Sequence, residues 1–210
     1  MVLNDLEEEG GSLMRLLWKK VKNRIRYTLN TLFQPQMVYG YTSPNGVKLS
    51  NTRVSNTTVL DNEKHLELED NVFIGHFNYI DATNHIIIRE GCQITNYISL
   101  LSHSSHQSIR LYGGDYRNYS DLIGYVKGSV EIGAYSFVGP HSVIMPGTKI
   151  GKGSLIAAYS YVSGEFPEFS VIAGNPAKVV GDTRASDEAM LQKHPELKEY
   201  YTAWAKGETV

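Results

Sequence analysis

Residues 130–163 read VEIGAYSFVGPHSVIMPGTKIGKGSLIAAYSYVS, and an aliphatic residue returns at every sixth position of this stretch. The aliphatic positions are Ile132, Val138, Ile144, Ile150, Ile156 and Val162. Two positions before each stands a small or β-branched residue: Val130, Ser136, Ser142, Thr148, Ser154 and Ser160. A short fixed period with its own internal order predicts a repeat protein, in which each unit buries its apolar side against the next unit.

The same period extends toward the N-terminus of the chain. Its positions there are Leu68, Ile74 and Ile80 and then, after a two-residue slip near Thr83, Ile88, Ile94 and Leu100. Three six-residue edges would make one turn of a triangular coil, so that each aliphatic residue stacks on a counterpart ~18 residues later. We therefore predict an all-β solenoid over residues 37–182. The 19 glycines of the chain predict tight turns, because glycine adopts positive φ at no steric cost.

Composition excludes several other classes of protein. The chain has 210 residues with 20 Lys+Arg against 22 Asp+Glu, and this net charge of -2 excludes a polybasic nucleic-acid binder. Its single cysteine, Cys92, excludes an intramolecular disulfide framework and a thiolate zinc cluster, and it fits the reducing cytoplasm. Residues 1–11 carry acids where a signal peptide carries bases, so we expect neither secretion nor a membrane-spanning helix.

Both ends of the chain are predicted to be helical. In residues 1–36, the apolar side chains of residues 12–33 recur every fourth position, and six cations lie between Arg15 and Arg26. This amphipathic helix is expected either to pack on the main domain or a neighbouring subunit, or to make a peripheral contact with an anionic membrane. Residues 183–210 are predicted to form a helical cap that starts near Ser186 and is interrupted at Pro195.

Three segments carry a resemblance to a known family. Residues 130–133 (VEIG), 146–151 (PGTKIG) and 174–180 (GNPAKVV) resemble the hexapeptide-repeat acyltransferases, in particular sugar O-acetyltransferases and maltose/galactoside acetyltransferases. The resemblance implies a left-handed parallel β-helix, a homotrimer, and acetyl-CoA as acyl donor without a metal. It also implies a cofactor site along the later coils, at Gly139, Ala157, Ala158 and Lys178.

The segment 101–128 interrupts the repeat and holds the candidate chemistry. Such loops are uncommon inside a solenoid unless they have a function. In the relatives, a histidine where such a loop begins acts as general base and follows the last aliphatic residue by five positions; here that position is Ser105. A one-residue shift reaches His106, which we favour over His103. Asp81, Asp115 and Asp121 are possible carboxylate partners, and no spacing selects one.

The same loop offers groups that suit a carbohydrate, which has apolar and polar sides. They are Arg110, Tyr112, Asp115, Tyr116 and Tyr119. The sequence thus favours an acetyl-CoA-dependent O-acetyltransferase acting on a sugar hydroxyl in surface polysaccharide or lipopolysaccharide biosynthesis, in the cytoplasm or at the inner face of the membrane. The alternatives are N-acylation of a nucleotide aminosugar, a γ-carbonic-anhydrase-like zinc enzyme and a non-catalytic scaffold.

Overall fold

The structure is a computed structural model, and it describes residues 2–206. Contacts divide the chain into two units, Met1–Gln36 and Met37–Val210. The first unit contains the helix α1 (Val2–Phe33), which begins well before Ser12, where the apolar pattern starts. It ends just before Gln34-Pro35, because proline cannot continue a helix. Within residues 2–206, no helix is long and apolar enough to cross a membrane.

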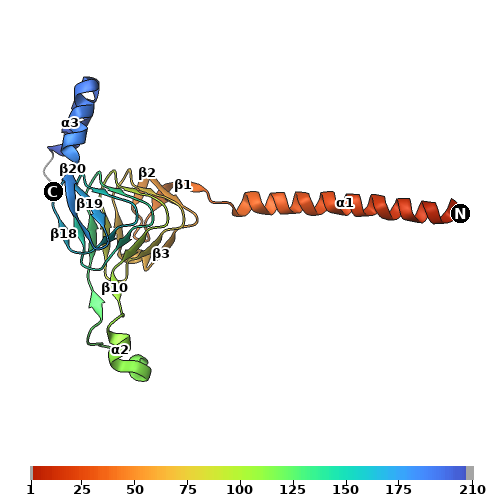
Figure 1. Ribbon diagram of the computed structural model, residues 1–210, viewed down its shortest axis with the longest axis horizontal. Coiled ribbons are helices and arrows are strands. Elements are labelled where there is room, and N and C mark those ends of the chain that lie inside the picture. Colours follow the sequence, from red (N-terminus) through yellow and green to blue (C-terminus); the bar gives the residue numbers. More distant parts are fainter. Residues whose placement is uncertain (1, 207–210) are drawn as a thin grey trace. The chain divides into compact units, whose positions relative to one another are not determined.

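The second unit is a β-helix of three sheets (Figure 1). Sheet A contains β1 (Met37–Thr42), β2 (Lys48–Ser55), β5 (Phe73–Ile74), β8 (Gln93–Ile94), β13 (Phe137–Val138), β16 (Leu155–Ile156), β19 (Ser170–Gly174) and β20 (Ala177–Asp182). Sheet B contains β3 (Val59–Asp61), β6 (Tyr79–Asp81), β9 (Ser99–Leu101), β14 (Val143–Ile144) and β17 (Tyr161–Val162). Sheet C contains β4 (Leu66–Leu68), β7 (Ile86–Ile88), β12 (Val130–Ile132), β15 (Lys149–Ile150) and β18 (Glu165–Phe166).

Strand pairing confirms the predicted period. Val138 pairs with Ile156, and Ile144 pairs with Val162, in parallel registers of 18 residues. In the coils before the loop the register is 20 residues, as in Phe73 with Gln93, so each of these coils absorbs a two-residue slip. The repeated aliphatic residues form one continuous buried core: Ile74, Ile80, Ile88, Ile94, Leu100, Ile132, Val138, Ile144, Ile150, Ile156 and Val162.

The long loop leaves the coils without disturbing their register. Ile94 pairs directly with Val138, and Leu100 with Ile144, although residues 101–128 lie between the paired coils in sequence. The loop itself contains β10 (His103–Ser104), α2 (Ser108–Tyr112), the short 3-10 helix η2 (Gly113–Asn118) and β11 (Val126–Lys127). Because β10 and β11 pair in antiparallel fashion, they form the base of an arm that carries α2 (Figure 1).

Sheet A ends in an antiparallel hairpin at both of its edges, β1 with β2 and β19 with β20. The turn of the second hairpin is Gly174-Asn175-Pro176, with a cis Asn175–Pro176 peptide, and it lies in the segment that carried the family resemblance. These hairpins complete sheet A with strands that no longer follow the coil. A further 3-10 turn, η1 (Glu63–His65), precedes β4.

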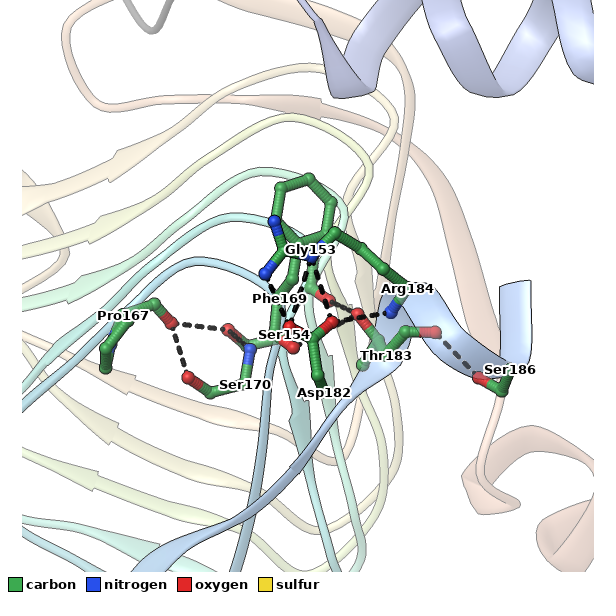
Figure 2. Close-up of polar contacts among 9 residues, drawn as sticks. All are labelled: Gly153, Ser154, Pro167, Phe169, Ser170, Asp182, Thr183, Arg184 and Ser186. Carbon is green, nitrogen blue, oxygen red and sulfur yellow. Dashed lines mark hydrogen bonds and ion pairs between the residues drawn. The ribbon is translucent and has the colours of Figure 1, made fainter. Parts of the chain in front are cut away.

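The C-terminal helices are α3 (Thr183–Lys193), η3 (Pro195–Leu197) and α4 (Lys198–Ala205). The predicted start near Ser186 is wrong, because the carboxylate of Asp182 accepts a hydrogen bond from the backbone N–H of Arg184 at 2.8 Å and caps the helix there. Figure 2 shows how this end is tied to the coils: the Thr183 hydroxyl donates to the carbonyl of Gly153 at 2.8 Å. The break at Pro195 occurs as predicted.

Several glycines are required by close contact between coils rather than by positive φ. A Cβ on Gly133 would lie 2.4 Å from the backbone nitrogen of Lys152, and one on Gly139 would lie 2.6 Å from that of Ala158. Positive φ at the coil corners is instead adopted mostly by other residues, among them Tyr97, His141 and Tyr159. The turn-based explanation of the glycine content is therefore correct only in part.

This packing predicts the effect of a single methyl group. Gly133→Ala should lower the free energy of unfolding by about 1–3 kcal/mol, since the adjacent backbone must shift to make room. Gly114→Ala is the matched control, because a Cβ at Gly114 meets no atom within 4 Å. Urea unfolding followed by circular dichroism measures both variants, and equal stabilities would contradict the close-contact explanation.

Candidate active site

The base of the arm brings His103 against a buried carboxylate. Nδ1 of His103 lies 2.5 Å from Oδ2 of Asp81, whose side chain is 1% exposed at the end of β6. The other carboxylate oxygen, Oδ1, accepts hydrogen bonds from the backbone N–H and the hydroxyl of Thr83, at 3.0 and 2.5 Å. Asp81 is therefore held rigidly by its own coil, and His103 reaches it from the next coil.

This contact determines which ring nitrogen faces outward. The two atoms lie at ion-pair distance without hydrogen-bond geometry, and a proton on Nδ1 would remove the repulsion between their lone pairs. In the neutral imidazole the second nitrogen, Nε2, is then unprotonated and can accept a proton. The side chain of His103 as a whole is one-third exposed.

A tyrosine and a lysine from the returning strand flank the same ring. The ring of Tyr125 stacks on His103 with centroids 5.6 Å apart and planes 14° apart. The ammonium of Lys127 lies 5.5 Å from the centroid of the Tyr125 ring, and Lys127 pairs with His103 in the ladder between β10 and β11. Burial, with smaller contributions from the charges of Tyr116 and Asp81, raises the pKa of Tyr125, so its phenol stays neutral at pH 7.

The root of the arm is closed by hydrogen bonds to the preceding coil. The backbone N–H of Asn84 donates to the buried hydroxyl of Ser102 at 2.8 Å, and its side-chain amide donates to the carbonyl of Ser102 at 3.1 Å. The backbone N–H of Gly128 donates to the same carbonyl, also at 3.1 Å. His103 directly follows Ser102, so these bonds fix the backbone from which its ring projects.

His106 occupies a different setting. Its side chain is exposed, and Nδ1 lies 2.9 Å from the hydroxyl of Ser104. Its carbonyl accepts a hydrogen bond from the guanidinium of Arg110. The buried carboxylate contacts His103, so the geometry favours His103 as the base, the reverse of the preference obtained by counting positions.

The predicted acceptor residues divide by what they contact. The Tyr112 hydroxyl accepts a hydrogen bond from the backbone N–H of Ile123 at 3.0 Å, and its ring lies 4.8 Å from that of Tyr119. Asp115 accepts a hydrogen bond from Asn118 at 3.1 Å. The contacts of Tyr112, Tyr119 and Asp115 are therefore with other parts of the arm itself. The same holds for Arg110. Tyr116 is close enough to the Tyr125 ring at the base of the arm to affect its pKa.

The residues predicted to hold the acyl donor lie elsewhere. Gly139, Ala157 and Ala158 lie at the corner between sheets A and B, which we call the A–B corner, and Lys178 is exposed on β20. Gly139 itself is buried against the backbone of Ala158. Strands of sheet B run from this corner to the corner where the arm begins, so the predicted donor residues and His103 lie at opposite ends of these strands.

The A–B corner also carries an exposed column of stacked rings. We call Phe77, Tyr97, His141 and Tyr159 the ring ladder; successive centroids lie 5.2, 4.8 and 4.9 Å apart. All four residues are exposed and all have φ near +60°. The ladder therefore runs along the corner, across successive coils.

Other candidate groups do not form a second reactive centre. Cys92 is buried, which raises the pKa of its thiol to about 12, and it donates to the carbonyl of Gly133, so it is not a nucleophile at pH 7. Among residues 2–206 no three His, Cys, Asp or Glu side chains cluster as metal ligands. A cavity of about 1180 Å³ lies beside Tyr135 and Trp204, between the coils and the C-terminal helices, and its lining does not include His103.

Comparisons with known proteins agree with this architecture. Residues 129–164 match the family model described as bacterial transferase hexapeptide (six repeats). The hexapeptide match is thus confined to the coils that follow the arm. The hexapeptide coils have solved counterparts: a hexapeptide-repeat-containing acetyltransferase from Vibrio cholerae superposes with a TM-score of 0.51 at 21% identity, covering 58% of this chain and 64% of that chain. The N-acyltransferase AntD from Bacillus cereus, solved with dTDP and 3-hydroxybutyryl-CoA, gives a TM-score of 0.54 at 13% identity, covering 71% of this chain and 89% of that chain.

Sequence relatives of the chain are matched over part of their length. Serine acetyltransferase 2 of Arabidopsis thaliana is 30% identical over 134 residues, which cover 64% of this chain and 38% of the plant protein. A probable acetyltransferase of Mycobacterium tuberculosis is 35% identical over 74 residues, which cover 35% of this chain and 25% of that protein. The chain therefore matches less than half the length of these relatives.

Counting positions did not identify every residue of the site. Asp81 was one of three possible carboxylates, while Thr83, Asn84 and Lys127 were not considered for the site. What these residues share is their position in the fold. They lie next to the two ends of the loop, either in the coil before it or in the strand that returns from it. Such neighbours become apparent once the coil register is known.

The contact with Asp81 predicts the tautomer of His103. In the neutral imidazole the proton should reside on Nδ1, and Asp81→Asn should return the ring toward the usual mixture, since the carboxylate that attracts the proton is gone. Nitrogen-15 NMR of the imidazoles at high pH distinguishes the two forms. His106→Ala should leave the His103 signals unchanged, and a wild-type His103 protonated on Nε2 would contradict the geometry.

Proposed function

We propose that the protein is an acetyl-CoA-dependent O-acetyltransferase that acts on a sugar hydroxyl. The observation that carries the proposal is the contact of His103 with buried Asp81 at the base of the arm, with Nε2 directed away from the carboxylate. The family match and the acetyltransferases among the relatives support acetyl transfer. The aromatic and polar side chains of the arm support a carbohydrate acceptor.

In the proposed reaction, Nε2 of His103 takes the proton of the acceptor hydroxyl as the oxygen attacks the thioester carbon. The C–O bond forms and the C–S bond breaks, and the proton passes from the imidazolium to the departing sulfur, so the products are an acetyl ester and free CoA thiol. Asp81 stabilises the imidazolium that forms between these steps. Stacking on Tyr125 holds the plane of the ring.

The proposal includes a cytoplasmic location and a sugar precursor as the acceptor. A single buried Cys92 fits the cytoplasm, where surface polysaccharide or lipopolysaccharide precursors would supply sugar hydroxyls. Residues 12–33 would keep the enzyme at the inner face of the membrane. Gly139, Ala157, Ala158 and Lys178 remain the proposed contacts of the donor, and Arg110, Tyr112, Asp115, Tyr116 and Tyr119 those of the acceptor.

Single substitutions should distinguish the roles of His103 and His106 in acetyl transfer. His103→Ala should lower kcat/KM for acetyl-CoA-dependent thiol release by about 10²–10⁴-fold, because a general base contributes a factor of this size. His106→Ala is the matched control and should retain most of the activity. A panel of sugar hydroxyl and aminosugar acceptors in the same assay distinguishes O-acylation from N-acylation. Stoichiometric zinc in the purified protein would favour the γ-carbonic-anhydrase-like alternative.

We also propose that the chain works as a homotrimer and that the ring ladder lies in its interface. The ladder exposes four rings at the corner that carries the proposed donor residues, while His103 lies at the other end of sheet B. One protomer would then supply the donor contacts, and its neighbour would supply the base. Such an interface would be heterologous and would close as a ring.

Disruption of the ladder should dissociate this assembly. Tyr97→Asp places a charge in the centre of the proposed interface, so we expect monomers in sedimentation velocity and loss of acetyl transfer together. Tyr39→Asp, at an exposed tyrosine of β1, is the control and should remain trimeric. An unaltered trimer for Tyr97→Asp would place the interface on another surface.

A further inference from the structure

We propose that the helix α1 (Val2–Phe33) is an interfacial membrane helix that lies flat on a surface of anionic phospholipid through residues 14–33. The inference concerns a surface outside the coils and does not depend on acetyl transfer. It rests on how apolar and basic side chains are distributed around this one helix.

Seven apolar side chains between Met14 and Leu32 form an exposed stripe along α1. At about 100° per residue, they fall within about a third of the circumference of the helix. They are Met14, Leu17, Trp18, Val21, Ile25, Leu29 and Leu32, and each is between 45% and 72% exposed. Thr28 also lies in the stripe, but its hydroxyl donates to the carbonyl of Arg24 at 3.0 Å, so it adds no unpaired donor to the apolar surface.

Cations line both edges of this stripe. On the same helical spacing, Lys20 and Arg24 follow one edge, and Arg15, Lys19, Lys22 and Arg26 follow the other. Among residues 17–33, the face opposite the stripe carries Asn23, Tyr27 and Asn30. A helix that sinks its apolar stripe to the depth of the acyl chains would place these long basic side chains at the level of the headgroups, where they reach phosphate.

The positive charges of residues 12–33 have no acidic partners within that segment of the helix. Residues 12–33 contain no Asp or Glu, and three cation pairs stand four residues apart: Arg15 with Lys19, Lys20 with Arg24, and Lys22 with Arg26. Like charges at this spacing repel and destabilise a helix. An anionic surface would supply the missing countercharge to both rows at once and remove the repulsion.

The same rows argue against a second copy of α1 as the occupant of the stripe. If helices packed stripe to stripe, the cations that border each stripe would face the cations of the neighbouring helix across the seam. This arrangement adds repulsion between chains to the repulsion within each chain. An anionic lipid surface would cover the apolar stripe and also neutralise the cations along both of its edges. The distribution of charge therefore favours lipid over a second copy of α1.

The test is cosedimentation of the full chain with vesicles. Phosphatidylcholine vesicles that contain phosphatidylglycerol should bind the protein, pure phosphatidylcholine should not, and added salt should weaken binding. The variant Lys19→Gln/Lys22→Gln/Arg26→Gln should bind at least about tenfold more weakly, since it removes three contacts with the surface. The control Lys48→Gln/Lys64→Gln/Lys193→Gln loses the same charge from exposed lysines of the other unit and should bind like the wild type.

Tryptophan fluorescence reports the orientation of the helix. In a Trp204→Phe background Trp18 is the only tryptophan, and its emission should shift to the blue on anionic vesicles because it enters an apolar layer. Equal binding to neutral and anionic vesicles, binding unchanged by the triple variant, or no shift of Trp18 would overturn the proposal. Self-association of the full chain in buffer that Trp18→Ser/Ile25→Ser abolishes, without vesicle binding by the wild type, would instead assign the stripe to a second copy. Neither readout involves acetyl transfer, so failure here leaves the proposed enzyme activity untouched.

Discussion

The backbone hydrogen bonds that join one coil to the next are the constraint on which the rest of the structure depends. The N–H of Gly75, Gly133 and Gly139 each donates at 2.8 Å to a carbonyl of the following coil. Coils held at this separation leave room on each edge for the repeated aliphatic side chain and for a second buried residue two positions before it, such as Ile86, Cys92 or Ser142. Their corners admit small hydroxyl residues whose donors are satisfied by the neighbouring coil, as when the Ser142 hydroxyl donates to the carbonyl of Ala157 at 3.0 Å.

The same rigidity allows a long arm to leave the coils and still position a reactive side chain. Because Leu100 pairs with Ile144 across the arm, the strands before and after it stay in register. The arm begins beside Asp81, a carboxylate that the preceding coil has buried and fixed through Thr83. His103 needs only to follow Leu101 by two residues to meet it. The proposed base is therefore positioned by the coils, whereas α2 and η2 lie farther along the arm.

Features of the fold that follow the six-residue repeat could be predicted from the sequence, whereas features outside the repeat could not. The aliphatic positions, the two-residue slip near Thr83 and the ejection of residues 101–128 all follow from a period of six, and strand pairing confirms them. The choice between His103 and His106 could not follow from that period, because residues inside the loop no longer obey it. Asp81 is 22 positions before His103, and this separation becomes a contact only when a coil of 20 residues stacks them. The start of α3 was misplaced because the capping carboxylate, Asp182, belongs to the preceding strand.

The ring ladder is a local conflict that the single chain does not resolve. Phe77, Tyr97, His141 and Tyr159 all have φ near +60°, and a left-handed conformation costs a residue with a Cβ about 1–2 kcal/mol, hence roughly 4–8 kcal/mol for the four. Three stacked ring pairs return about 0.5–1.5 kcal/mol each, which offsets only part of this cost. Glycine or asparagine would adopt the same backbone conformation with less strain, as Gly147 does at the corner that follows β14. In the proposed homotrimer, contacts with a neighbouring chain would bury the exposed edges of these rings. An interface over the A–B corner would provide such contacts and would bring a neighbour to the corner that carries Gly139 and Ala158.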